Sequence, residues 1–163
     1  MRMDSITDFM DKDHRIIDAL WKNAHDAANN QAWLLAQDML TIFTQALLLH
    51  IDAEEDILFP AIEEKQGWEE GPTSFMRHEH KQIRYQLQQL EKLADTGEYH
   101  EFLKVGDLLT ALLALHNSKE EKVLYPLCDQ VMGIEHQEVL DLIKGRIGKD
   151  AHTHTGQKIE TGS

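Results

Sequence analysis

A tandem repeat with an offset of 66 residues organises this sequence. The longer pattern occurs as His50-x3-Glu54-Glu55-x2-Leu58-Phe59-Pro60 and as His116-x3-Glu120-Glu121-x2-Leu124-Tyr125-Pro126. The second occurs as Thr7-x-Phe9-Met10-x2-Asp13-His14-x2-Ile17 and as Thr73-x-Phe75-Met76-x2-Glu79-His80-x2-Ile83. Each half of the chain therefore holds one isolated histidine and one His-x3-Glu pair in the same register. We expect the two halves to pack together about a pseudo-two-fold axis.

The spacing of the apolar residues predicts an all-α protein. They recur at three- and four-residue steps, and only three prolines and nine glycines interrupt the 163 residues. The expected helices span residues 5–28, 32–65, 72–95, 99–132 and 135–147. Short connections make neighbouring helices antiparallel, so the pattern predicts an up-down-up-down four-helix bundle with a short C-terminal helix. We expect one domain over residues 1–147 and a mobile polar tail over 148–163.

Two prolines fall at equivalent places in the repeat, ten residues after each paired histidine. Pro60 and Pro126 each remove a backbone donor and crowd the preceding turn. We therefore expect each of them to bend or to end its helix.

Each His-x3-Glu pair places an imidazole and a carboxylate on one face of a helix, one turn apart. Both pairs are expected to face the bundle interior, because they share stripes with apolar residues. The first stripe contains Leu35, Met39, Ile42, Phe43, Ala46, Leu47, Ile57 and Leu58, and the second contains Leu109, Leu112, Leu113, Val123 and Leu124. Neither stripe carries a lysine or an arginine.

A buried ionised carboxylate is very costly unless it is paired or bound to a cation. Two such carboxylates on apolar stripes therefore indicate a metal site, and the repeat indicates a site for two ions. Nitrogen and oxygen donors inside a helix bundle suit iron, with manganese or zinc as alternatives. The predicted ligands are His14, His50, Glu54, His80, His116 and Glu120.

Four further acidic residues repeat beside the predicted ligands. They are Asp13, Glu79, Glu55 and Glu121. We expect them either to be solvated or to hold a histidine from outside the ligand set. The pattern does not identify the groups that complete the coordination; Tyr85 and Tyr99 are conceivable, but the repeat places neither of them.

Composition restricts the partners and the compartment. A net charge of −13 with a pI near 5.1 argues against nucleic acid or an anionic membrane as a partner. The N-terminal residues lack the apolar region of a secretory signal. Cys128 is the one cysteine, so an intrachain disulfide is impossible. We expect a cytoplasmic protein; the sequence predicts no particular protein partner.

Four motifs resemble the bacterial hemerythrin-like proteins, the family of HHE cation-binding domains. They are DHR, HIDAEE-ILFP, EHKQIR and HNSKEE-VLYP, and they span most of residues 5–132. The resemblance implies a four-helix bundle with a non-haem di-iron centre, in which an oxo or hydroxo group and two carboxylates bridge the iron ions. It also implies that the six residues selected by the repeat are the iron ligands.

The sequence departs from the oxygen-carrying hemerythrins at two places. Those proteins have His-x3-His on the third helix and His-x4-Asp on the fourth. Here Arg84 stands four residues after His80, and Glu120 stands four residues after His116. One histidine ligand is therefore missing, which implies room for external ligands and argues against simple oxygen carriage.

The expected function is binding of, or reaction with, oxygen, nitric oxide or peroxide, in an oxygen, redox or nitrosative response. Two alternatives remain at this point. One is an iron-dependent sensor, and the other is a module that stores or donates iron without turnover. Whether the protein is an enzyme is left open.

Overall fold

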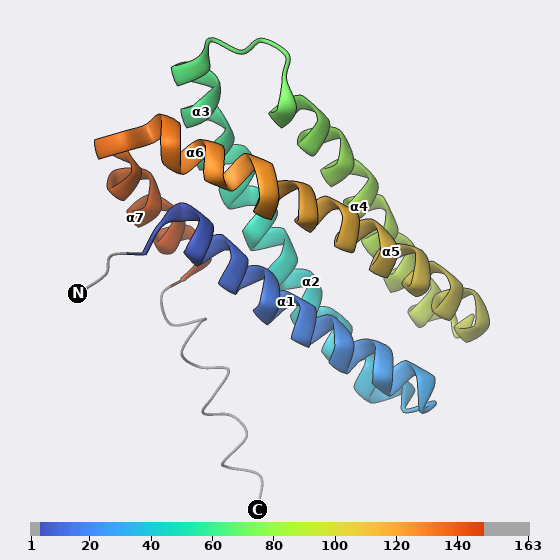
Figure 1. Ribbon diagram of the computed structural model, residues 1–163. Helices are drawn as coiled ribbons and strands as arrows, with labels where there is room; N and C mark the ends of the chain where they lie inside the picture. The colour runs from blue at the N-terminus through green and yellow to red at the C-terminus, as the bar shows by residue number, and fades with distance from the viewer. Residues whose placement is uncertain (1–3, 149–163) are drawn as a thin grey trace, which may run out of the picture.

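The computed structural model describes residues 4–148, and these residues form helices joined by short turns (Figure 1). The elements are α1 (Ile6–Asn29), α2 (Trp33–Ala53), the π-helical turn η1 (Glu54–Leu58), α3 (Phe59–Gln66), α4 (Pro72–Thr96), α5 (Tyr99–Lys119), the π-helical turn η2 (Glu120–Leu124), α6 (Tyr125–Met132), the 3₁₀ turn η3 (Gly133–Glu135) and α7 (His136–Ile147). These bounds agree closely with the expected helices. Apart from Gly148, the predicted tail lies outside the described residues.

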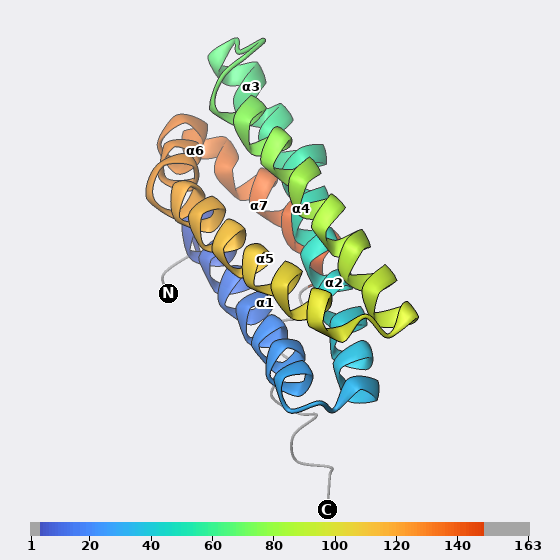
Figure 2. The same cartoon turned by 90° about the vertical axis from the view of Figure 1, so that its right-hand side faces the viewer.

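The helices form two hairpins that pack side by side. The first hairpin pairs α1 with α2, and the second pairs α4 with α5. Between the hairpins, α1 contacts α5 and α2 contacts α4 (Figure 2). The prediction of an all-α four-helix bundle is confirmed, and each hairpin corresponds to one half of the repeat.

The start of the first helix follows from a capping box. The Ser5 hydroxyl accepts a hydrogen bond from the Asp8 backbone N–H at 2.9 Å, and the Asp8 carboxylate accepts one from the Ser5 backbone N–H at 3.4 Å. Such reciprocal bonds satisfy donors that a helix start otherwise leaves free. Gly67 and Gly97 end two other helices in the left-handed region, with φ of 65° and 73°.

The helices do not end at the two repeat prolines. Pro60 and Pro126 each follow a π-helical turn, after which the α-helix resumes. The closing bonds of these turns run from the Phe59 N–H to the Glu54 carbonyl and from the Tyr125 N–H to the Glu120 carbonyl. The expectation that the helix ends at each proline is therefore wrong, because the wider turn carries the helical path across it. Such π turns frequently occur at functional sites.

Two apolar clusters fill the bundle. One lies toward the α1–α2 and α4–α5 turns and includes Trp21 and Phe43. The other includes Phe59, Tyr125 and the apolar face of α7. The predicted apolar stripes are too wide, because Leu35, Ile42 and Val123 are 51%, 43% and 60% exposed. Neighbouring helix positions lie about 100° apart, so each of these residues points past the face that the bundle buries.

One helical path, Trp33–Gln66, is long and apolar enough to cross a membrane by length and composition alone. It comprises α2, η1 and α3, and α2 packs against α1 and α4 within the bundle. Helices that line the core of a soluble bundle satisfy the same criterion.

Candidate metal centre

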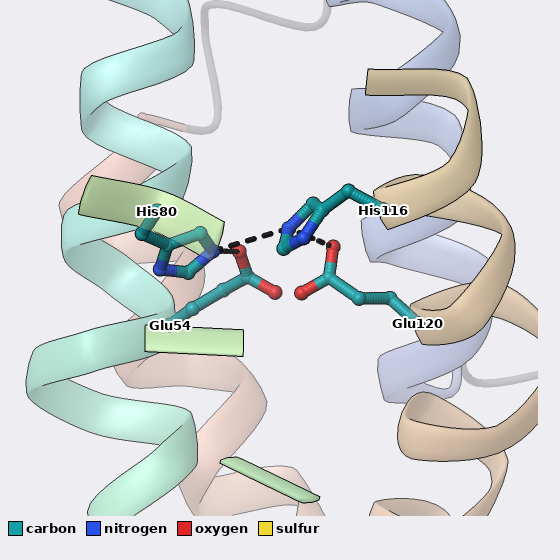
Figure 3. Close-up of side chains that lie close together, drawn as sticks. All are labelled: Glu54, His80, His116 and Glu120. Atoms are coloured by element: carbon teal, nitrogen blue, oxygen red, sulfur yellow. Dashed lines mark hydrogen bonds and ion pairs between the residues drawn. The ribbon is translucent and has the colours of Figure 1, made fainter. Parts of the chain in front are cut away.

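All six residues selected by the repeat lie together inside the bundle. Each of them is at most 2% exposed. They come from the four long helical paths: His14 from α1, His50 from α2, Glu54 from η1, His80 from α4, His116 from α5 and Glu120 from η2. Figure 3 shows four of these side chains, Glu54 from the first hairpin and His80, His116 and Glu120 from the second, pointing toward one another.

The donor atoms divide into two groups that share one carboxylate. One group contains Glu54, His80, His116 and Glu120, and the other contains His14, His50 and Glu120; within each group the donor atoms lie within 4.8 Å of one another. The π turns contribute to this arrangement, because each begins at one of the two glutamates. A carboxylate common to both groups is placed where it could bridge two ions.

All four histidines direct Nε2 at these carboxylates. The distances to Glu120 Oε1 are 3.3 Å from His14 and 3.2 Å from His116. The distances to Glu54 Oε1 are 3.5 Å from His50 and 3.3 Å from His80. Each glutamate therefore faces one histidine of its own hairpin and one of the other hairpin. Glu120 faces His116 and, from the first hairpin, His14. Glu54 faces His50 and, from the second hairpin, His80.

The opposite ring nitrogens face an outer set of carboxylates. The Nδ1 distances are 2.7 Å from His50 to Asp13, 3.1 Å from His116 to Glu79, 3.4 Å from His80 to Glu55 and 3.9 Å from His14 to Glu121. These are the four repeated acidic residues. The geometry supports the interpretation that Asp13 and Glu79 hold histidines through hydrogen bonds, whereas Glu55 and Glu121 make longer contacts, and Nδ1 of His80 and of His14 has no hydrogen-bond partner among the described residues. A carboxylate on Nδ1 fixes the orientation of an imidazole that binds a metal through Nε2.

Basic residues neutralise part of this outer set. Arg84 contacts the Glu55 carboxylate at 2.6 Å, and Arg15 contacts that of Glu121 at 2.7 Å. Burial opposes ionisation of Glu55, but His80 and Arg84 outweigh it and hold its pKa at about 2. The Glu55 carboxylate is therefore held ionised and in place.

Tyr125 lies at the centre of the cluster, although the sequence argument did not select it. Its side chain is fully buried. Its hydroxyl oxygen lies 2.8 Å from Glu54 Oε2 and 3.1 Å from Glu120 Oε1. It also lies 3.1 Å from His50 Nε2 and 3.2 Å from His14 Nε2. A phenol oxygen is thus a seventh candidate donor.

The two tyrosines considered from the sequence lie elsewhere. Tyr85 is 58% exposed, and Tyr99 stacks on Trp33 with ring centroids 3.8 Å apart. The sequence did contain a signal that could have identified Tyr125. It is a difference between the two copies of the repeat, because Tyr125 replaces Phe59 in a motif that is otherwise nearly identical. A hydroxyl added to a buried ring needs a polar partner, and this position follows each paired glutamate by five residues.

Bound cations would compensate the buried carboxylates of Glu54 and Glu120 better than the neighbouring side chains do. Burial and the neighbouring Glu120 raise the pKa of Glu54, whereas His116 and the other hydrogen-bond donors outweigh burial and hold the pKa of Glu120 well below its usual value. Burial and the two glutamates raise the pKa of Tyr125 well above its usual value. Glu54 Oε1 and Glu120 Oε2 are buried without a hydrogen-bond partner among the described residues. Metal ions between these oxygens and the four Nε2 atoms would satisfy both, so the donor set fits a pair of metal ions.

Comparison with known proteins agrees with this geometry. The family model described as the hemerythrin HHE cation-binding domain matches residues 5–128 and, separately, residues 71–160. The second match begins 66 residues after the first, which is the offset of the repeat. Comparison with curated proteins and with solved structures gives no significant match. The first match covers most of the chain, and the chain therefore belongs to the hemerythrin family of HHE cation-binding domains.

Proposed function

We propose that the protein binds two iron ions in this cluster and that the centre engages oxygen, nitric oxide or peroxide in a redox or nitrosative response. The observation that carries the proposal is the convergence of four imidazole Nε2 atoms on two buried glutamates. Iron bound there would supply a change of oxidation state and coordination positions for a small ligand. The residues that would hold the ions are His14, His50, Glu54, His80, His116 and Glu120.

A surface cavity supports access of a small ligand to the cluster. It has a volume of about 700 Å³ and lies between α1 and α5. Its lining includes Glu121, whose carboxylate lies 3.9 Å from His14 Nδ1. Since the predicted ligands are themselves almost fully buried, we propose that a small molecule reaches the centre from this side, beside His14.

The outer carboxylates favour a retained centre over a module that donates iron. Two histidines of the cluster, His50 and His116, have a carboxylate hydrogen-bonded to the outer ring nitrogen, and one of these carboxylates, that of Asp13, is only 4% exposed. A ligand set fixed from outside resists the rearrangement that rapid iron release requires. We therefore expect slow loss of iron to a weak chelator.

The decisive experiment combines metal analysis with spectroscopy and turnover. We expect about two irons per chain and a near-ultraviolet charge-transfer band that weakens on reduction, because two iron ions fit the donor set. Added peroxide or nitric oxide should perturb the band or be consumed. Glu120→Ala should abolish both the perturbation of the band and the consumption of the added molecule, whereas Glu64→Ala, at an exposed position of α3, should retain them. The proposal would be refuted if the protein cannot be loaded with iron, or if its bound iron reacts with none of oxygen, nitric oxide and peroxide.

A further inference from the structure

The short helix α7 fills a groove on the first half of the bundle. Its residues Leu140 and Ile143 are fully buried in the cluster that includes Phe9 of α1. Lys144 lies over the Phe9 ring, with the ammonium 5.5 Å from the ring centroid, and Arg146 contacts Asp56 of η1 at 2.8 Å. The helix therefore spans the groove between α1 and η1.

The second half of the bundle has the equivalent groove, and no described segment fills it. This α4–η2 groove has a volume of about 620 Å³. Its lining includes Phe75, Met76, Val123 and Leu124, which the repeat offset relates to Phe9, Met10, Ile57 and Leu58. The clearest difference is at the phenylalanine, because Phe9 is 5% exposed under α7 whereas Phe75 is 72% exposed.

We propose that the α4–η2 groove docks an amphipathic helix of a partner protein. The floor offers what α7 uses on the first half: a phenylalanine ring, a methionine and two aliphatic side chains from a π turn. An exposed apolar surface rimmed by polar residues, here His78, Glu79 and Lys119, is typical of a protein interaction site. Grooves of this kind receive the apolar face of a helix.

The charges at the repeat mates of the residues that pair with α7 specify the partner helix. Lys144 of α7 pairs with Asp4 at 3.6 Å, and the repeat mate of Asp4 is also acidic, Glu70. Arg146 pairs with Asp56, but the repeat mate of Asp56 is Lys122. The occupant therefore carries the apolar pattern and the lysine of α7, with an acidic residue in place of its arginine. The same reversal disfavours α7 of a second copy.

The groove also borders the candidate metal centre. Glu79 lines the groove, and its carboxylate contacts His116 Nδ1 at 3.1 Å and the Lys119 ammonium. A helix docked here would touch the residue that orients one predicted ligand. The inference goes beyond the proposed function, and its test does not depend on iron chemistry.

The test uses labelled peptides of residues 134–148, one with the natural sequence and one with Arg146→Glu, in anisotropy titrations of the full chain. We expect the Arg146→Glu peptide to bind the wild-type protein about fivefold more tightly, because an exposed repulsion becomes an attraction. Lys122→Asp should reverse the preference. Phe75→Asp should abolish binding, while Leu108→Asp, at a position of α5 that is also well exposed, should not.

Three outcomes would overturn the proposal. The first is failure of both peptides to bind the wild-type protein. The second is binding that ignores Phe75→Asp, which would mean that the peptide displaces α7 from its own groove. The third is a stable dimer, observed by sedimentation, that Phe75→Asp dissociates, since the occupant would then be a second copy of this chain. The reversed preference at Lys122 distinguishes docking in the groove from non-specific adsorption.

Discussion

Tyr125 and Phe59 occupy the same position of the repeat, but only Tyr125 carries an oxygen into the cluster of predicted ligands. The Phe59 ring lies parallel to the His80 ring, at an interplanar angle of 9° with centroids 5.7 Å apart. The Tyr125 ring lies 5.6 Å from the His14 ring. The interplanar angle is larger there, 35°, but each ring lies against the isolated histidine of the other hairpin, and the hydroxyl is the chemical difference between the two rings. It makes the His14 and His50 side of the centre chemically distinct from the other side.

This asymmetry predicts a spectroscopic effect of Tyr125→Phe. The substitution installs the residue of the other repeat copy, so the ring should still pack and the iron content should remain close to that of the wild type. If the phenol oxygen binds ferric iron as phenolate, the wild type has a visible charge-transfer band that the variant lacks. Tyr85→Phe, at an exposed position, is the control and should leave the spectrum unchanged. A visible band that survives in the Tyr125→Phe protein contradicts tyrosine ligation.

The fold was predictable because two levels of the sequence agree. Helical periodicity located the helices, and the repeat related the two hairpins, so an error in one copy could be corrected by the other. The cluster was predictable for the same reason, since a polar residue on an apolar stripe is rarely repeated by chance. Glu54 and Glu120, both fully buried, are the clearest examples.

The features that could not be predicted from the sequence are those that depend on contacts between helices. The position of the Tyr125 hydroxyl depends on the π turn before it, which shifts every following residue around the helix axis. The exposure of Val123 and Phe75 depends on where α7 packs, and α7 has no counterpart in the repeat. The periodicity of one helix cannot show which of its apolar faces remains uncovered.

The outer carboxylates predict a loss of metal affinity in Asp13→Ala. The Asp13 carboxylate contacts His50 Nδ1 at 2.7 Å, so its removal frees the imidazole to rotate and lowers its basicity. Loss of such a partner typically weakens metal binding roughly 10–100-fold. Chelator competition measures the effect, with Asp38→Ala, at an exposed position of α2, as the control. Equal affinities in the two variants would show that Asp13 does not support His50.

The pKa values of the metal-free cluster predict proton release on metal binding. Burial lowers the pKa of His14 and of His80, but their glutamate partners outweigh it and raise these values to about 10 and about 9. Both imidazoles are therefore protonated at neutral pH and must lose a proton to bind a metal. Calorimetric titration with a divalent metal in buffers of different ionisation enthalpy counts the protons. We expect at least one proton released per chain at neutral pH, and affinity that increases with pH; metal binding without proton release would exclude protonated imidazoles in the metal-free protein.

The same pKa values predict that the metal-free protein loses stability in alkaline solution. A histidine whose pKa is higher in the folded than in the unfolded chain contributes stability that is fully present below the unfolded value of about 6.5. The contribution of His14 and His80 is lost as the pH rises through about 9 and about 10, because the folded chain then gives up its extra protons. Urea midpoints of the metal-free protein should therefore fall as the pH is raised from 7 to about 10. The metal-loaded protein is the internal control, since bound metal has already displaced these protons and its midpoint should change less over the same interval. Parallel falls of the two midpoints would place the alkaline loss of stability outside the cluster.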